Sequence, residues 1–145
     1  MESFDPDAFL KMLIGGVPFD ENRYASLLAH KWGDPFKLLI MTMLSQNTSD
    51  VNTLKAYEQL SSVVEISPNS LASLSLELLS SLIRPAGLYK RRAFTIHKIS
   101  EILLERFDGD LKQILNKSCK EAREILLSLP GIGMKTADIL LLFAS

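Results

Sequence analysis

Helix start and stop signals punctuate this sequence at short intervals, and they constrain its fold more than any other feature. Ser or Asp followed by Pro is a strong helix start, because the side-chain oxygen caps backbone N–H groups and Pro fits the first helical turn. Asp34-Pro35 and Ser67-Pro68 both carry this signal, and Ser118 is a further capping residue. Gly or Pro follows several of the segments that begin in this way. The pattern predicts a chain of short helices.

Apolar residues between these signals recur at helical spacing, and no segment shows the strict alternation of a half-buried strand. The sequence contains 26 Leu and four Val. Leu favours helices, whereas β-branched residues favour strands. We therefore expect an all-α chain of about eight to ten short helices around one core. The expected helices cover about 7–14, 22–32, 36–44, 50–60, a short segment after 68, one starting near 75, 89–107, a short segment after 110, 119–128 and a last one from about 135.

Composition excludes several classes of protein. With 145 residues, 47% hydrophobic and 23% charged, the chain has the make-up of one folded domain and not of a disordered one. Its single Cys, Cys119, cannot form an internal disulfide, a four-Cys zinc site or a cysteine-held iron–sulfur cluster. The sequence shows neither a signal peptide nor an apolar run that approaches the roughly 20 residues needed to span a bilayer. We expect a cytoplasmic protein without a membrane partner.

Charge is unevenly distributed along the chain, although the formal net charge is only −1. Residues 1–83 hold five Lys or Arg and ten Asp or Glu, whereas residues 84–145 hold eleven and seven. The densest basic stretch runs from Arg84 to Lys98 and contains no acidic residue. Such asymmetry indicates a basic face that could bind a polyanion. On charge alone, a solvated helix surface is the simpler interpretation.

The segment Leu-Pro-Gly-Ile-Gly at 129–133 lies between two predicted helices. Its two Gly residues permit a tight hairpin with positive φ and close approach of the backbone to another group. The helix that follows presents free N–H groups and the positive end of its dipole, which together form an anion site. This arrangement is typical of the helix-hairpin-helix, which binds DNA phosphates without reading bases. The alternative is a corner between two helices that requires two Gly residues.

Three segments together resemble the endonuclease III family of DNA glycosylases. They are LLIMTMLSQNTSD at 38–50, GLYKRRA at 87–93 and LPGIGMKTAD at 129–138. They occur in the family's order, and the resemblance covers the chain from about residue 23 to its end. It implies a helix-hairpin-helix DNA glycosylase fold, with a six-helix barrel domain over residues 22–145 and the hairpin at 129–134. Residues 1–21 would be an N-terminal helical segment that belongs to a second, otherwise missing domain.

The resemblance also implies base excision repair by a DNA glycosylase that is also an AP lyase, acting on damaged bases such as oxidised pyrimidines or on abasic sites in duplex DNA. Lys135 stands where the family has its nucleophile, at the start of the second hairpin helix. Its amine would attack C1′, form a Schiff base and permit β-elimination. A Lys amine is nucleophilic only when neutral, and burial and a helix N-terminus both disfavour the ammonium form. A solvated surface Lys is the alternative.

In the same family, the loop after the first signature inserts into the duplex and fills the gap left by the flipped nucleotide. Gln46 and Asn47 carry amides that can donate to and accept from an orphaned base, and we favour Asn47 as the inserted residue. A simple capped turn is the alternative for residues 45–49. Arg92 would be a phosphate contact or a solvated cation. The other expected DNA contacts are Lys90, Arg91, Gly131, Gly133, Met134 and Thr136.

The chain departs from the family's pattern after Lys135. Full-length members continue past the second hairpin helix, where they place a catalytic Asp and, in many cases, a four-Cys iron–sulfur loop. Here the only acidic residue after Lys135 is Asp138. We expect Asp138 to pair with its neighbours or point to solvent, base excision to be severely impaired and lyase chemistry to survive weakly. With one Cys the 4Fe-4S cluster cannot form, so no cofactor or metal is expected in this chain.

Two other functions stay open at this point. The chain could be a non-catalytic helix-hairpin-helix DNA-binding module, or a helical scaffold that binds other proteins. The apolar run Leu140–Phe143 favours an exposed C-terminal helix and self-association through it. His30, Trp32 and His97 are expected to be core or surface residues and not ligands. As a DNA-binding protein of the cytoplasm, the chain would associate with the nucleoid.

Overall fold

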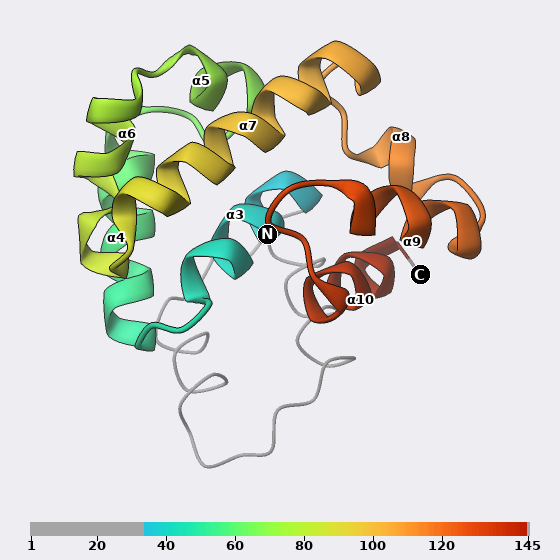
Figure 1. Ribbon diagram of the computed structural model, residues 1–145, viewed down its shortest axis with the longest axis horizontal. Coiled ribbons are helices and arrows are strands. Elements are labelled where there is room, and N and C mark those ends of the chain that lie inside the picture. The colour runs from blue at the N-terminus through green and yellow to red at the C-terminus, as the bar shows by residue number, and fades with distance from the viewer. Residues whose placement is uncertain (1–33, 145) are drawn as a thin grey trace, which may run out of the picture.

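The computed structural model describes residues 34–144, and every regular element in this part of the chain is helical (Figure 1). The all-α prediction is therefore confirmed. The elements are α3 Pro35–Ser45, α4 Asp50–Val63, α5 Pro68–Ser73, α6 Leu76–Leu82, the 3₁₀ turn η1 Arg84–Ala86, α7 Tyr89–Phe107, α8 Lys112–Leu115, α9 Cys119–Ser128 and α10 Met134–Ala144. The helices predicted over 7–14 and 22–32, with His30 and Trp32, lie outside the described residues, as does the segment 1–21.

The predicted capping residues begin the helices that they precede. Asp34 Oδ1 accepts a hydrogen bond of 2.9 Å from the Phe36 N–H, and Pro35 occupies the first turn of α3. This cap satisfies a backbone donor that the helix itself leaves without a partner. Four further helices, α4, α5, α6 and α9, begin in the same way at Ser49, Ser67, Ser75 and Ser118.

Helix α3 lies at the centre of the described structure, where it contacts α4, α7 and α10. Figure 1 shows α4 and α6 to one side of α3 and α9 and α10 to the other. The side chains of α3 are buried on nearly all of its faces, as expected for an almost wholly apolar helix. Those without any exposed surface are Leu38, Leu39, Ile40, Met41 and Leu44. Each contributes roughly 1.5–3 kcal/mol by leaving water.

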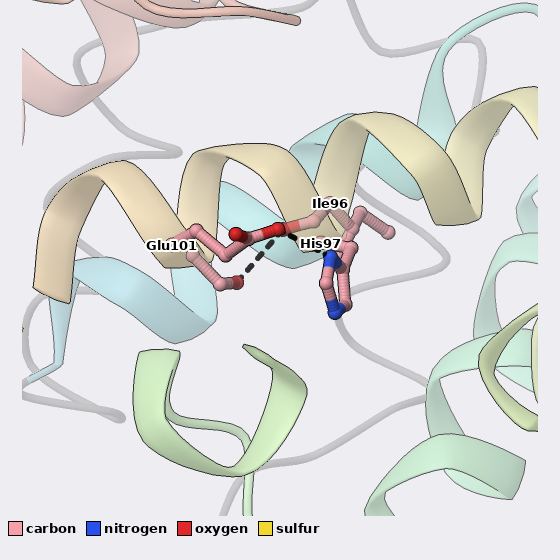
Figure 2. Close-up of polar contacts among 4 residues, drawn as sticks. Ile96, His97 and Glu101 are labelled. Atoms are coloured by element: carbon pink, nitrogen blue, oxygen red, sulfur yellow. Dashed lines mark hydrogen bonds and ion pairs between the residues drawn. The ribbon is translucent and has the colours of Figure 1, made fainter. Parts of the chain in front are cut away.

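Helix α7 is amphipathic, and Phe94 lies outside its buried face. Ala93, Ile96 and Leu103 are fully buried, whereas Phe94 is 59% exposed. Because Phe94 lies one residue beyond Ala93, it projects about 100° away from the core-facing stripe. On the same helix, His97 Nδ1 lies 2.7 Å from Glu101 Oε1. A dashed line marks this contact in Figure 2. His97 is thus a partly buried surface residue, as expected.

The apolar end of α10 is packed against the protein. Leu140 is fully buried, and Leu141 and Leu142 are partly buried. The helix contacts α3, α8 and α9, which cover it from several sides because they converge on the same core. The prediction of an exposed apolar surface at residues 140–142 is therefore wrong. Among the described residues, no helix is long and apolar enough to cross a membrane.

Candidate nucleic-acid interface

The hairpin between α9 and α10 packs tightly against the rest of the domain at Gly131. This residue has a φ of 79°, which Gly adopts without steric cost. A Cβ at Gly131 would lie 2.5 Å from Thr95 Cγ2 and 2.8 Å from Met43 Cε. The expected close approach of the backbone is thus an approach to α7 and α3.

Gly133 differs from Gly131 in both respects. Its φ is not positive, contrary to the expectation for two such residues, and a Cβ built on it would meet nothing within 4 Å. No steric contact among the described residues therefore requires Gly at this position. The open space lies beside the first turn of α10, where backbone N–H groups have no partner within the helix. This space is available to an external anion.

Residues 134–136 form the first turn of α10 and place three predicted site residues in different surroundings. Lys135 is exposed at the N-terminus of α10. Its predicted position at the start of this helix is therefore confirmed, whereas the burial that would disfavour its ammonium form is not. Met134 is 67% exposed, whereas Thr136 is only 2% exposed. A direct DNA contact by Thr136 would therefore use its backbone N–H, because its side chain faces the protein.

The polar loop after α3 lies next to this turn. Gln46 Nε2 donates a hydrogen bond of 3.2 Å to Thr136 Oγ1, which joins segments 90 residues apart in the sequence. Asn47 has a φ of 55° and an exposed side chain. The two neighbouring amides therefore differ. The Gln46 side chain is bound to Thr136, whereas Asn47 has a left-handed backbone conformation and an exposed side chain. The loop and the lysine-bearing helix form one surface.

Arg92 contacts backbone carbonyls of this surface. Its Nη1 donates to Met43 O at 2.7 Å, its Nε donates to Gly87 O at 3.0 Å, and its Nη2 donates to Gln46 O. Burial lowers the pKa of the Arg92 guanidinium below its ordinary value. Arg92 is therefore a structural residue here, whereas the sequence predicted a phosphate contact or a solvated cation. The sequence carries one indication of this structural role: the last turn of α3 contains no basic residue that could bind the carbonyls at its own end.

A cleft of about 400 Å³ opens where these segments meet. The residues that line it are Met43, Gln46, Asn47, Leu88, Arg91, Arg92, Thr95, Ile96 and Gly131. The structure thus brings together four of the predicted site residues, the two amides, Arg91 and Gly131. The other predicted site residues do not line the cleft: Lys90 is exposed on α7, and Gly133, Met134, Lys135 and Thr136 lie at the start of α10.

Leu88 was not anticipated as a site residue. It is 63% exposed, has a φ of 44° and lines the cleft. A bulky residue in this backbone conformation is unusual and marks a constrained turn. The available signal was an apolar residue directly between the helix-ending Gly87 and the first residue of α7.

Asp138 forms an ion pair with Arg123 that joins α10 to α9. This confirms the expectation that the only acid after Lys135 pairs with a neighbour. Among residues 34–144, no group of three or more His, Cys, Asp or Glu could hold a metal ion. Cys119 is exposed, and one thiol does not fit a cluster that needs four cysteines.

Sequence comparisons agree with this geometry. Residues 40–138 match the model of the HhH-GPD superfamily of base excision DNA repair proteins. The chain is 44% identical to endonuclease III of Thermotoga maritima over 112 residues, which cover 77% of this chain and 48% of the relative. It is 36% identical to endonuclease III of Escherichia coli over 110 residues, covering 76% and 48%. The chain spans about half the length of these curated relatives.

Solved structures give the same result. A trapped endonuclease III–DNA covalent intermediate is similar with a TM-score of 0.64 and 28% identity, covering 84% of this chain and 58% of that one. A Helicobacter pylori 3-methyladenine DNA glycosylase bound to 1,N6-ethenoadenine is similar with a TM-score of 0.65 and 25% identity, covering 95% and 64%. With the hairpin, the cleft and Lys135 in place, the chain belongs to the HhH-GPD superfamily of base excision DNA repair proteins.

Proposed function

We propose that this chain acts in DNA base excision repair as the barrel domain of an endonuclease III-like glycosylase and AP lyase, with Lys135 as the nucleophile. One observation carries the proposal: the hydrogen bond from Gln46 to Thr136 places the polar loop beside the turn that holds Lys135. A loop that occupies the duplex and a nucleophile that attacks the displaced nucleotide must lie this close together. The trapped covalent complex of endonuclease III with DNA supports the same chemistry.

The hairpin would bind the DNA backbone. The N–H groups in the first turn of α10 attract a phosphate, and the open space at Gly133 lets it approach. Arg91, which lines the cleft, and the exposed Lys90 would add attraction to further phosphates. These contacts position the duplex without reading its sequence.

Asn47 and Leu88, which both line the cleft, would enter the duplex. Asn47 has the amide donor and acceptor that an orphaned base requires. Leu88 is an exposed apolar side chain on a constrained turn, which suits a wedge that separates stacked bases. Together they would stabilise the displaced nucleotide outside the helix.

The chemistry follows from the position of Lys135. Its neutral amine attacks C1′ of the abasic sugar in its open aldehyde form, and loss of water gives a Schiff base. Removal of a C2′ proton then expels the 3′ phosphate by β-elimination, and water releases the enzyme from the unsaturated sugar. The sequence of steps requires an amine and proton transfers and no cofactor.

Excision of an intact base makes a further demand, because the departing base needs assistance from an acid that the family places after this region. Asp138 forms an ion pair with Arg123, so we do not assign it this role and propose Lys135-dependent lyase chemistry at abasic sites as the reaction of the described residues. Oxidised pyrimidines are the proposed damage class, and the nucleoid is the proposed location. Sedimentation would test whether the chain self-associates. The burial of Leu140 favours a monomer, because it removes this side chain from the surface through which two copies would bind.

Borohydride trapping on a duplex with one abasic site tests the proposal. We expect a covalent protein–DNA adduct that Lys135→Ala abolishes. Salt-sensitive duplex binding without a Lys135-dependent adduct would instead indicate a non-catalytic DNA-binding module. A chain that binds neither intact nor abasic duplex would indicate a protein-interaction scaffold.

A further inference from the structure

Arg92 and Gln46 form a continuous polar link between two segments that line the cleft, the end of α3 with its loop and the start of α7, and the first turn of α10. The Arg92 guanidinium binds the carbonyls of Met43 and Gln46 at the end of α3. The Gln46 side chain then binds Thr136 on α10. The link therefore begins in the first turn of α7, passes through the polar loop and ends one residue from Lys135.

Arg92 supplies part of the hydrogen bonding at the end of α3. Ser45 Oγ binds Thr42 O at 2.7 Å and Thr53 Oγ1 binds Leu44 O at 3.4 Å, whereas the carbonyls of Met43 and Gln46 are bound by Arg92. The last carbonyls of a helix have no partner within the helix, and α3 has no basic residue in its last turn to bind them. The planar guanidinium carries five donors in a rigid fork and can bind several carbonyls at once. Arg92 thereby sets the backbone direction at Gln46, directly before the left-handed turn at Asn47.

Gln46 and Asn47 have separate tasks in this arrangement. Gln46 is bound through its carbonyl by Arg92 and through its side chain by Thr136. Its amide cannot keep this contact and also reach into a duplex. Both amides are exposed and line the cleft, but the Gln46 side chain is bound to Thr136, so Asn47 is the amide assigned to the duplex.

We propose that Arg92 and Gln46 are positioning residues, which hold the Asn47 loop in register with the helix that carries Lys135. Neither touches the reacting atoms. The inference rests on the proposed function, since the register matters only if Asn47 and Lys135 act on one displaced nucleotide. Arg92→Lys would keep the positive charge but lose the fork that binds three carbonyls.

Single-turnover strand cleavage of an abasic duplex by the 145-residue chain tests the inference. The variants are Arg92→Met, Arg92→Lys and Gln46→Ala, with Arg106→Met as a matched control. Arg106 lies on the same helix, about 21 Å further along its axis. The rate constant at saturating protein and the protein concentration at half-maximal rate are measured separately.

Arg92→Met and Gln46→Ala are expected to lower the rate constant at saturation by about 10- to 100-fold, because misplacement by about 1 Å has an effect of this size. Arg92→Lys should recover part of the loss, and Arg106→Met should match the unaltered chain. The concentration at half-maximal rate should change less, since the hairpin contacts to phosphate persist. A merely structural role would lower the fraction of active protein and leave the rate constant of that fraction unchanged.

The possible outcomes separate this inference from the proposed function. Unaltered rate constants in Arg92→Met and Gln46→Ala, with cleavage still dependent on Lys135, overturn the inference alone. If Arg92→Met does not fold, Gln46→Ala decides, because it removes one exposed side chain. Cleavage that survives Lys135→Ala, or no cleavage at all, overturns the proposed lyase. If the lyase is overturned in this way, duplex binding tests the inference instead. The preference of the protein for an abasic-analogue duplex over an intact duplex must be lost in Gln46→Ala and retained in Arg106→Met. Any other pattern overturns the inference.

Discussion

The two ends of α3 are held in different ways. At its beginning, Asp34 and Pro35 lie next to the residues that they stabilise, and one hydrogen bond of 2.9 Å caps the helix. At its end, the carbonyls of Met43 and Gln46 are bound by Arg92, which lies 49 and 46 residues further along the chain. The locally capped end is remote from the cleft, and the end held by tertiary contacts borders it.

This difference teaches where function and stability are coupled in this domain. A change at the N-terminal end of α3 should affect the free energy of unfolding and leave DNA chemistry intact. A change at the C-terminal end should affect both, because Met43, Gln46 and Asn47 line the cleft. Variants at the two ends should therefore differ in their effects on the free energy of unfolding and on strand cleavage.

Gly131→Ala should have the largest effect. The added Cβ would clash with Thr95 on α7 and with Met43 at the C-terminal end of α3, and the backbone φ at this position is positive. We expect a loss of about 2–4 kcal/mol in the free energy of unfolding, measured by urea denaturation, together with loss of abasic-site cleavage.

Gly133→Ala is the matched control for this variant. Open space at Gly133 predicts a change in stability within about 0.5 kcal/mol but weaker duplex binding, since the methyl group would face the approaching phosphate. Equal stability of the two Gly→Ala variants would contradict the packing assigned to the hairpin.

Asp34→Ala probes the N-terminal end of α3. Loss of the cap should lower the free energy of unfolding by about 1 kcal/mol. The rate constant of strand cleavage should stay unchanged, as measured on the same abasic duplex. A reduced rate constant would show that the two ends of α3 are coupled and would remove the contrast between them.

Tyr57 gives the N-terminal end a dependence on pH. Burial, and secondarily the Asp34 carboxylate, raise the pKa of the Tyr57 hydroxyl above its ordinary value of 10.0. The stabilising effect of the neutral hydroxyl is complete below pH 10 and declines as the pH rises above it. At pH 11 the decline should be roughly 1 kcal/mol. Urea denaturation between pH 8 and 11 should show a steeper fall for the unaltered chain than for Tyr57→Phe, and parallel curves would refute the prediction.

Asp138→Asn should have the smallest effect. The Arg123–Asp138 pair is more than one third exposed on both sides, and such pairs contribute about 0–1 kcal/mol. Thermal unfolding should shift little, and borohydride trapping should proceed at the rate of the unaltered chain. Abolished trapping in a folded Asp138→Asn protein would instead assign Asp138 the role of the acid that the family places further along.

Several elements were predictable because their causes are local. The ranges expected for α7 and α9 agree with Tyr89–Phe107 and Cys119–Ser128, since Gly87 and Ser118 lie beside their starts. The exposure of Phe94 could not be predicted, because apolar spacing alone does not show which stripe of α7 meets the core. The apolar end of α10 was expected to be exposed because the sequence alone does not show that α3, α8 and α9 pack against it.

Only part of the candidate site could be predicted, because only some of its features depend on residues that are close together in the sequence. The sequence by itself determined the helix starts, the hairpin and the position of Lys135 at the beginning of α10, because caps, Gly residues and helix termini act within a few residues. The tertiary structure alone decided that Arg92 binds carbonyls, that Gln46 contacts Thr136 and that Leu88 borders the cleft. These contacts join segments tens of residues apart, and they exist only after helix packing has brought the segments together.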